Sequence, residues 1–313
     1  MRNLLIFFCI VSTSFAITAK EAYIKAKSLE KAGDIQDALL WYKKSAELSL
    51  NIKKKEIEKN IKSEVFKRER LAHNNKLIEA YKTNYIMPVT YNTVYHNGRK
   101  SVETEFQISI KKKLLSNFLG LNERLYFGYT QRSFWQTTKK SSPFRETNYM
   151  PEFFVVFPYV NKITYLNSYK IGLLHQSNGR GGLNSRSWNR LYLQGFFKYK
   201  KITIVPRVWY RLPERKKRYP LDANGDDNPD IWNYMGYGDL KIIYPYKKHR
   251  FSFIFRDNLR SHNNKGAIKF KWTFPLFKDG IYGYIQLFNG YGESLIDYNK
   301  QNSKIGIGFA ITR

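Results

Sequence analysis

Hydrophobic and polar residues alternate along most of the chain after Met87 and Pro88, in segments of about ten residues separated by Gly, Asn, Asp and Lys turns. In the last segment, Lys304 and three small residues alternate with Ile305, Ile307, Phe309 and Ile311. Twelve such segments lie near 84–95, 103–114, 122–133, 150–159, 168–177, 188–199, 201–211, 236–246, 249–259, 265–275, 280–289 and 303–312. This pattern predicts an all-β transmembrane barrel of about 12 antiparallel strands at 83–313.

The segment 17–82 has a different pattern, because it is rich in Ala, Leu, Lys and Glu with few Gly and no Pro. This composition predicts helices. The spacing of Ala22, Ala26, Leu29, Gly33 and Ala38 resembles one helix-turn-helix unit of a tetratricopeptide repeat (TPR-like). One such unit cannot bury its own apolar face. The segment is therefore either a module that docks a partner or a solvated, helical periplasmic extension.

Residues 1–16 have the three zones of a secretory signal peptide, with Arg2 before the apolar run Leu4–Val11 and small residues up to Ala16. Cys9 is the only cysteine, so the mature chain would have no disulfide. No later segment offers the roughly 18 uninterrupted apolar residues of a spanning helix. An exported, membrane-associated chain of this kind is periplasmic or a closed barrel, and the strand pattern favours a multi-pass barrel in the cell outer membrane.

Composition adds two observations. Aromatic residues make up 17% of the chain, which suits the interfacial girdles of a membrane barrel. The formal net charge of +29 invites a nucleic-acid partner, but the export signal argues against nucleic acid. Basic residues on loops and in the lumen could instead contact anionic lipid headgroups or lipopolysaccharide, or reflect compositional bias without a partner.

The segment from His175 to Asn189 contains a base, a hydroxyl nucleophile and an orienting amide. If a hairpin is symmetric about Gly182, His175 lies opposite Asn189. Ser177 then shares their face, about 6 to 7 Å from His175 along the strand. The three residues fit a Ser-His-Asn triad, although Ser, Asn and Gly are also ordinary turn residues.

The same parity places the triad at the edge of an apolar face. Four neighbours on that face are apolar: Ile171, Leu173, Leu191 and Leu193. The opposite face carries Lys170, Gly172, Arg190 and Tyr192, with Leu174 as the exception. Such a face is expected to contact lipid, so the substrate would arrive through the membrane.

These motifs resemble the outer membrane phospholipase A family (phospholipase A1), calcium-dependent lipases in twelve-stranded outer-membrane barrels. The resemblance runs from about Tyr129 to the end of the chain, and its most specific blocks are His175–Arg180 and Ser185–Arg190. Further blocks agree in order: Tyr129–Ser133, Ser141–Tyr149, Asp226–Ile231, Tyr234–Tyr237 and Gly290–Asn299. The N-terminal helical segment is longer than is usual in the family, so no role for it is implied.

The resemblance implies that Ser177 is the nucleophile, His175 the general base and Asn189 the group that fixes the imidazole tautomer. It also implies a Ca2+ ion beside the serine, polarising water in the oxyanion hole. The calcium ligands would be the Arg180 carbonyl, Ser185 and the carbonyl of Ser141 from the second subunit of a homodimer.

Two further sites follow less directly from the resemblance. A second calcium site of some family members uses two aspartates, matched here by Gly182 and Asp227, so one carboxylate is missing. Gln131 matches a polar residue at the family's dimer interface, and the alternative is a lumen-facing side chain. The run Asp222–Asn228 lacks the final Glu of an EF-hand and is interpreted as a surface loop.

The resemblance therefore implies a calcium-dependent hydrolase that cleaves sn-1 and sn-2 ester bonds of membrane phospholipids and lysophospholipids and is activated by dimerisation. The alternative is a catalytically inactive barrel that acts as a small porin or adhesin. A third interpretation is a periplasmic binding module built on the helical segment.

Overall fold

The computed structural model describes residues 17–74, 78–159, 163–222, 224–277 and 280–313, and for 59–74 only the backbone. The predicted signal peptide, 1–16, lies outside the described residues. The chain divides into two compact units, and the boundary lies between residues 76 and 77, six residues before the predicted one. The two units are described separately.

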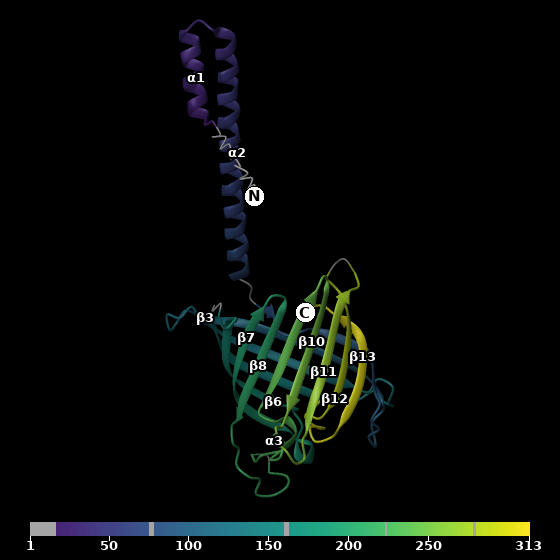
Figure 1. The fold of residues 1–313 in the computed structure, drawn as a ribbon. Coiled ribbons are helices and arrows are strands. Elements are labelled where there is room, and N and C mark those ends of the chain that lie inside the picture. Colours follow the sequence, from purple (N-terminus) through teal and green to yellow (C-terminus); the bar gives the residue numbers. More distant parts are fainter. Residues whose placement is uncertain (1–16, 75–77, 160–162, 223, 278–279) are drawn as a thin grey trace, which may run out of the picture. The chain divides into compact units, whose positions relative to one another are not determined.

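The first unit is the expected helical hairpin of α1 (Ala19–Lys31) and α2 (Ile35–Asn74) (Figure 1). A capping box starts α1, because the Thr18 side chain accepts from the Glu21 amide and the Glu21 carboxylate accepts from the Thr18 amide. Ala22, Ala26 and Ala38 are buried, and Gly33 takes the left-handed conformation that the turn requires. No helix in the described ranges has both the length and the apolar content needed to cross a membrane.

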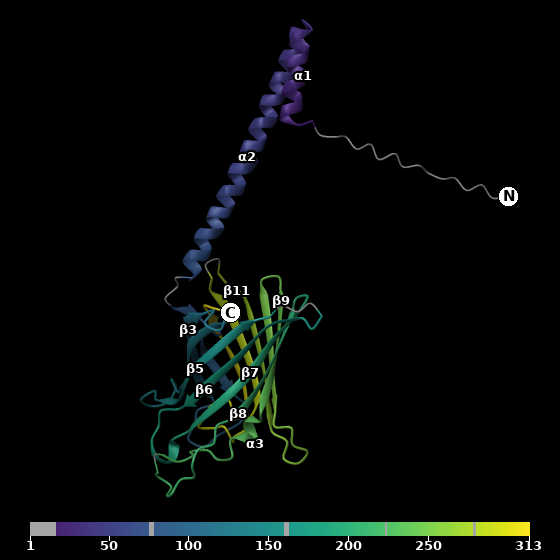
Figure 2. The same ribbon diagram turned by 90° about the vertical axis from the view of Figure 1, so that its left-hand side faces the viewer.

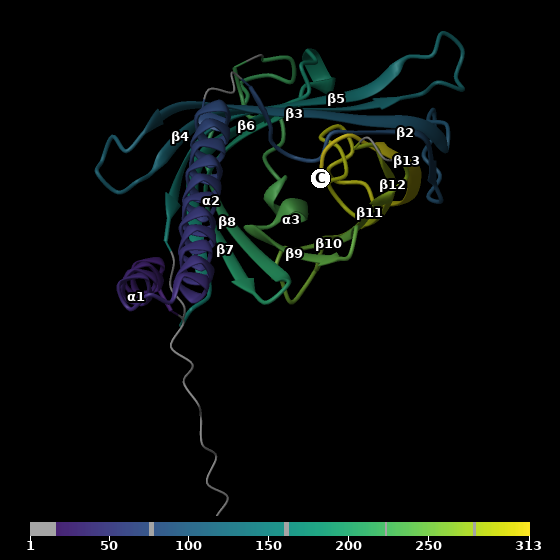
Figure 3. The same cartoon turned by 90° about the horizontal axis from the view of Figure 1, so that it is seen from above.

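The second unit is a closed barrel of twelve antiparallel strands, which confirms the predicted architecture (Figures 1 and 3). The ring closes because the first barrel strand pairs with the last. The strands are β2 (Tyr85–Asn92), β3 (Val102–Ser116), β4 (Arg124–Trp135), β5 (Phe144–Pro158), β6 (Leu166–Ser177), β7 (Ser187–Tyr199), β8 (Ile202–Arg211), β9 (Gly238–Tyr246), β10 (His249–Asp257), β11 (Gly266–Pro275), β12 (Tyr282–Gly290) and β13 (Asn302–Ala310). A short additional strand, β1 (Glu79–Ala80), pairs with β3 and was not predicted.

The barrel is apolar outside and polar inside. On β13 the outward residues Ile305 and Ile307 are 49% and 57% exposed, while Lys304 is buried in the lumen. The Lys304 ammonium lies 2.6 Å from a Glu105 oxygen, 2.5 Å from Glu293 and 3.5 Å from Glu103. This distribution is the one that a lipid-facing barrel requires, since lipid replaces water around its circumference.

The two ends of the barrel differ (Figure 2). The C-terminus lies at one end, and longer loops with the short helices η1 (Gly182–Asn184) and α3 (Trp232–Met235) lie at the other. A cluster of large apolar residues fills the lumen near this loop end and includes Trp188, Trp209, Ile231, Met235 and Leu295. Of the run Asp222–Asn228, the described residues Asp222 and 224–228 belong to a loop, as expected from the sequence.

Candidate active site

The hairpin of β6 and β7 brings His175 and Asn189 together at the loop end. The register pairs His175 with Asn189 and Ser177 with Ser187, as the parity count predicts. His175 Nδ1 lies 2.8 Å from Asn189 Oδ1. Because an amide oxygen only accepts, Nδ1 carries the proton and Nε2 is left as the basic nitrogen. This tautomer is the one that a general base requires.

The His–Asn pair faces outward from the barrel. On the same face Leu173 and Leu191 are 51% and 44% exposed, whereas their neighbours Lys170 and Arg190 are buried in the lumen. Leu174, the apolar exception in the sequence pattern, is also buried and packs in the cluster near Trp188. The pair therefore lies beside lipid-facing residues, where an ester group of a membrane lipid can reach it.

Ser177 occupies the predicted place on this face at the last residue of β6, and its side chain is half-buried. In the described part of the chain, no hydrogen bond joins its hydroxyl to His175. The structure thus shows the hydrogen bond between His175 and Asn189 already formed, with Ser177 two residues away on one strand face. Catalytic hydrogen bonds of this kind often tighten only when substrate is bound.

Glu214 extends the pair and was missed by the sequence reasoning. Asn189 Nδ2 donates to Glu214 Oε1 at 3.1 Å, and the Leu212 amide donates to the Asn189 carbonyl at 2.9 Å. Burial raises the pKa of the Glu214 carboxyl, and the neighbouring charge of Asp226 acts in the same direction. Glu214 lies in the loop after β8, where no periodicity or motif connects it with a residue of β7.

Two of the predicted calcium ligands, Arg180 and Ser185, lie in the loop between β6 and β7, and Ser141 lies in another turn. Ser185 Oγ donates to Asp227 Oδ2 at 2.6 Å. The Arg180 amide donates to Asn178 Oδ1 at 3.2 Å, and Ser141 lies in the turn between β4 and β5 with a φ of 62°. A hydroxyl beside a carboxylate is a hard oxygen donor set, which suits calcium. Among the described residues, however, no group of three or more His, Cys, Asp or Glu side chains could hold a metal.

A cationic side chain already occupies the position of the possible second calcium site. Lys217 Nζ lies 2.6 Å from Asp227 Oδ1, and Ser185 binds the other oxygen of that carboxylate. Gly182 contributes no side chain and has a φ of 63°. The pair does not reproduce a site made by two aspartates, in agreement with the missing carboxylate in the sequence.

Gln131 lies on the outer face of β4, so the alternative of a lumen-facing side chain is wrong. The Tyr129 hydroxyl donates to Gln131 Oε1 at 3.0 Å, and Gln131 Nε2 donates to Ser133 Oγ at 3.3 Å. These contacts form a short polar row on a face that otherwise contacts lipid. Such a row favours contact with a second polar surface over contact with acyl chains.

A closed barrel with an apolar exterior, carrying an oriented His–Asn pair and a serine on its outer face, defines the class of outer-membrane barrels with a hydrolase-type site. The sequence model of the family described as Phospholipase A1 matches residues 59–311. That range covers most of the chain, so this protein belongs to the phospholipase A1 family of outer-membrane proteins.

Individual relatives agree with this assignment. The "Putative phospholipase A1" of Neisseria meningitidis serogroup B is 39% identical over 72% of this chain, and the alignment spans 62% of that relative's length. An active-site mutant of Escherichia coli outer membrane phospholipase A, with an asparagine replaced by alanine, is 32% identical. Its TM-score is 0.67, and the match covers 75% of this chain and 92% of the Escherichia coli chain. The Salmonella typhi outer membrane phospholipase dimer with bound calcium is 33% identical and has a TM-score of 0.68. The match covers 76% of this chain and 93% of that chain.

Proposed function

We propose that this chain is a calcium-dependent outer-membrane phospholipase that hydrolyses sn-1 and sn-2 ester bonds of phospholipids and lysophospholipids. The observation that carries the proposal is the hydrogen bond between His175 and Asn189 on an outward face, with Ser177 on the same strand. The active-site asparagine of the similar Escherichia coli structure supports a catalytic role for Asn189.

The chemistry follows from the tautomer. Ser177 Oγ attacks the ester carbonyl carbon while His175 Nε2 takes the hydroxyl proton. Collapse of the tetrahedral intermediate breaks the ester bond, and the imidazolium returns its proton to the departing glycerol oxygen. Water then attacks the acyl-serine with His175 again as base, which releases the fatty acid and restores the serine.

Asn189 keeps the imidazole in place but, unlike an aspartate, carries no charge to stabilise the imidazolium. The Glu214 carboxylate accepts from the Asn189 amide at 3.1 Å. It therefore supplies a negative charge on the side of Asn189 away from His175. Ser185, the Arg180 carbonyl and the partner's Ser141 are the residues that would hold calcium. When bound, the ion would stabilise negative charge developing on the carbonyl oxygen. The calcium-bound dimer of the similar Salmonella typhi protein supports this assignment.

Substrate access and dimerisation both depend on the outer face. The exposed Leu173 and Leu191 beside the pair offer acyl chains an apolar surface. Gln131 lies on the same outer surface, and a second barrel placed against it would cover its polar row and line a cleft for the substrate. Contact with lipopolysaccharide stays a prediction from the net charge.

Replacing Ser177 with alanine tests the proposal. Ser177→Ala should abolish fatty-acid release from phospholipid micelles and leave a folded barrel whose gel migration changes on heating. Ser168→Ala, on the same strand far from His175, is the matched control and should retain activity. Turnover by the Ser177→Ala variant would refute the assignment of the nucleophile, whereas an inactive but folded wild-type dimer would favour the passive barrel.

A further inference from the structure

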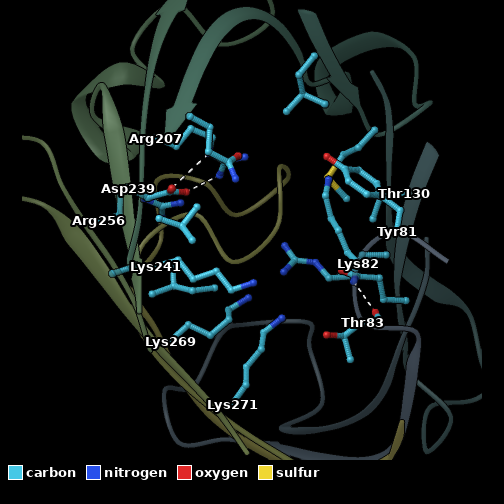
Figure 4. Close-up of a pocket in the computed structure, with 18 of the residues that line it drawn as sticks. Tyr81, Lys82, Thr83, Thr130, Arg207, Asp239, Lys241, Arg256, Lys269 and Lys271 are labelled. Atoms are coloured by element: carbon cyan, nitrogen blue, oxygen red, sulfur yellow. Dashed lines mark hydrogen bonds and ion pairs between the residues drawn. The ribbon is translucent and has the colours of Figure 1, made fainter. Parts of the chain in front are cut away.

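The barrel lumen contains a cavity of about 470 Å³ whose walls are strongly basic (Figure 4). Eleven Lys and Arg side chains line it, and Asp239 is the one carboxylate among the described lining residues. The cavity lies inside the barrel, whereas His175 and Asn189 face outward. It is therefore a different site from the hydrolase site, and nothing in the proposed hydrolysis uses it.

Most of these cations have no carboxylate partner. Asp239 is bound by Arg207, with one contact of 3.2 Å, and Lys82 and Lys170 share Glu152 at 2.7 and 4.0 Å. By contrast, no ion pair within the described ranges involves four further lining residues: Lys241, Arg250, Lys269 and Lys271. Among the described residues, therefore, no carboxylate lies within ion-pair distance of these four cations.

The unpaired lysines surround one space. The register places Lys241 and Lys269 on either side of Ile254, so their backbones lie two strand spacings, or about 10 Å, apart. Lys271 follows Lys269 by two residues on the same face, about 7 Å along the strand. Figure 4 shows the amino groups of Lys241, Lys269 and Lys271 directed into the same opening, with Lys82 on the facing wall.

A purely structural role does not explain this arrangement. Elsewhere in the same lumen, the buried Lys304 is surrounded by three carboxylates, those of Glu103, Glu105 and Glu293. Like charges held together in a medium of low dielectric constant repel one another unless a counter-charge is present. The cavity thus has fewer carboxylates for each cation than the surroundings of Lys304 have.

We propose that this cavity binds a small soluble anion that carries two or more phosphate groups. Several ammonium groups, carried by backbone positions about 7 to 10 Å apart, suit an ion with separated charged groups better than a single halide ion. The cavity extends along the barrel. Its lining includes Lys82, Arg250 and Arg313 toward the end that carries the C-terminus, and Met235 and Gly292 toward the loop end. A lipid-borne phosphate fits less well, since its acyl chains would have to enter this polar lumen.

Calorimetric titration of pyrophosphate into the refolded full chain tests the proposal. The protein is kept in a nonionic detergent with a chelator, so that neither headgroups nor calcium compete, and ionic strength is fixed with NaCl. We expect one saturable site that binds pyrophosphate more tightly than orthophosphate. Lys241→Gln combined with Lys271→Gln should weaken binding at least about tenfold, because two charge-assisted contacts are lost.

The matched control is Lys247→Gln combined with Lys248→Gln, which removes the same charge from the exposed turn between β9 and β10. This variant should bind within about twofold of wild type. Heat-modifiable gel migration establishes that each variant is folded. Absence of a saturable site, or equal weakening in both double variants, would show only general attraction to a basic protein and overturn the proposal.

A second ligand distinguishes a soluble phosphate from a phosphate carried by a lipid. Dihexanoyl phosphatidic acid, used below its micelle-forming concentration, presents one phosphate group on a lipid, so its matched soluble ion is orthophosphate. Weaker binding of this lipid than of orthophosphate supports a soluble ligand. Tighter binding that the Lys241/Lys271 variant loses would overturn the assignment to a soluble ion.

Discussion

Replacing Glu214 with glutamine isolates the contribution of a charge beyond the His–Asn pair. Glutamine keeps an oxygen that can accept from Asn189 Nδ2, so the hydrogen bond of 3.1 Å can persist while the charge is lost. The imidazole is neutral in the ground state and cationic in the transition state. The substitution should therefore lower kcat and leave KM unchanged.

The expected size follows from the distances. His175 Nδ1 lies 2.8 Å from Asn189 Oδ1, and Asn189 Nδ2 lies 3.1 Å from Glu214 Oε1. With about 2.3 Å between the two heteroatoms of the amide, the charge lies at most about 8 Å from the imidazole. Glu214 is half-exposed, so an effective dielectric constant of about 40 to 80 applies, and the interaction is about 0.5 to 1 kcal/mol. Loss of this interaction reduces kcat about two- to sixfold.

The pH dependence provides a separate test. The raised pKa of Glu214 means that its carboxylate gains a proton at a higher pH than an ordinary carboxyl, whose pKa is about 4.3. At a pH above the pKa of Glu214 in the folded protein, the carboxylate is charged and the kcat of wild type exceeds that of the variant. As the pH falls through that value, the ratio of the two kcat values should approach one, whatever else titrates in both proteins.

The assay is initial fatty-acid release in mixed micelles with saturating calcium, over a range of pH, for wild type and Glu214→Gln. Glu79→Gln, at the opposite end of the barrel, removes an equal charge as a control and should not change kcat. A kcat ratio that stays at one at every pH, or a change confined to KM, would refute the reasoning.

Three further substitutions test other parts of the account. Asn189→Ala should lower kcat by about 10- to 100-fold in the micelle assay, because His175 loses its orienting acceptor; an unchanged kcat would contradict this. Lys304→Met leaves the buried Glu105 without its cation, whereas Glu103 and Glu293 keep Arg99, and it should destabilise the barrel by about 3 to 5 kcal/mol in urea unfolding; equal or greater stability would be inconsistent with it. Gln131→Leu removes the polar row on β4 and should reduce the dimer fraction measured by cross-linking, with unchanged monomer stability; an unaltered dimer fraction would argue against this interface.

The bilayer explains why so much of the barrel could be predicted from sequence. A lipid-facing strand must alternate apolar and polar residues, so the strands can be counted as alternating segments between turns. The pairing of His175 with Asn189 follows from parity once the hairpin is taken to be symmetric about Gly182. The start of β5 was placed at residue 150 instead of Phe144, because the segment Arg145–Tyr149 carries polar residues on both faces and shows no alternation. The two-residue β1 is too short for any pattern.

The contacts between distant segments could not be predicted in this way. Glu214 reaches Asn189 from a loop 25 residues further along, and its position depends on how that loop packs against the hairpin. The inward direction of Lys241 and Lys271 follows from parity, but their lack of carboxylate partners depends on side chains across the whole lumen. The sequence explains the excess of basic residues by contact with lipid headgroups or lipopolysaccharide or by compositional bias, and the structure places eleven of these residues around the cavity in the lumen.

The most direct test of the central claim is fatty-acid release from phospholipid micelles by the refolded protein, with calcium and then with a chelator, beside Ser177→Ala. The proposed triad and metal together predict release with calcium, loss of release with the chelator and no release from the variant under either condition. Release that persists in Ser177→Ala would contradict the proposed nucleophile. No release by a folded wild-type dimer would contradict the enzymatic function itself.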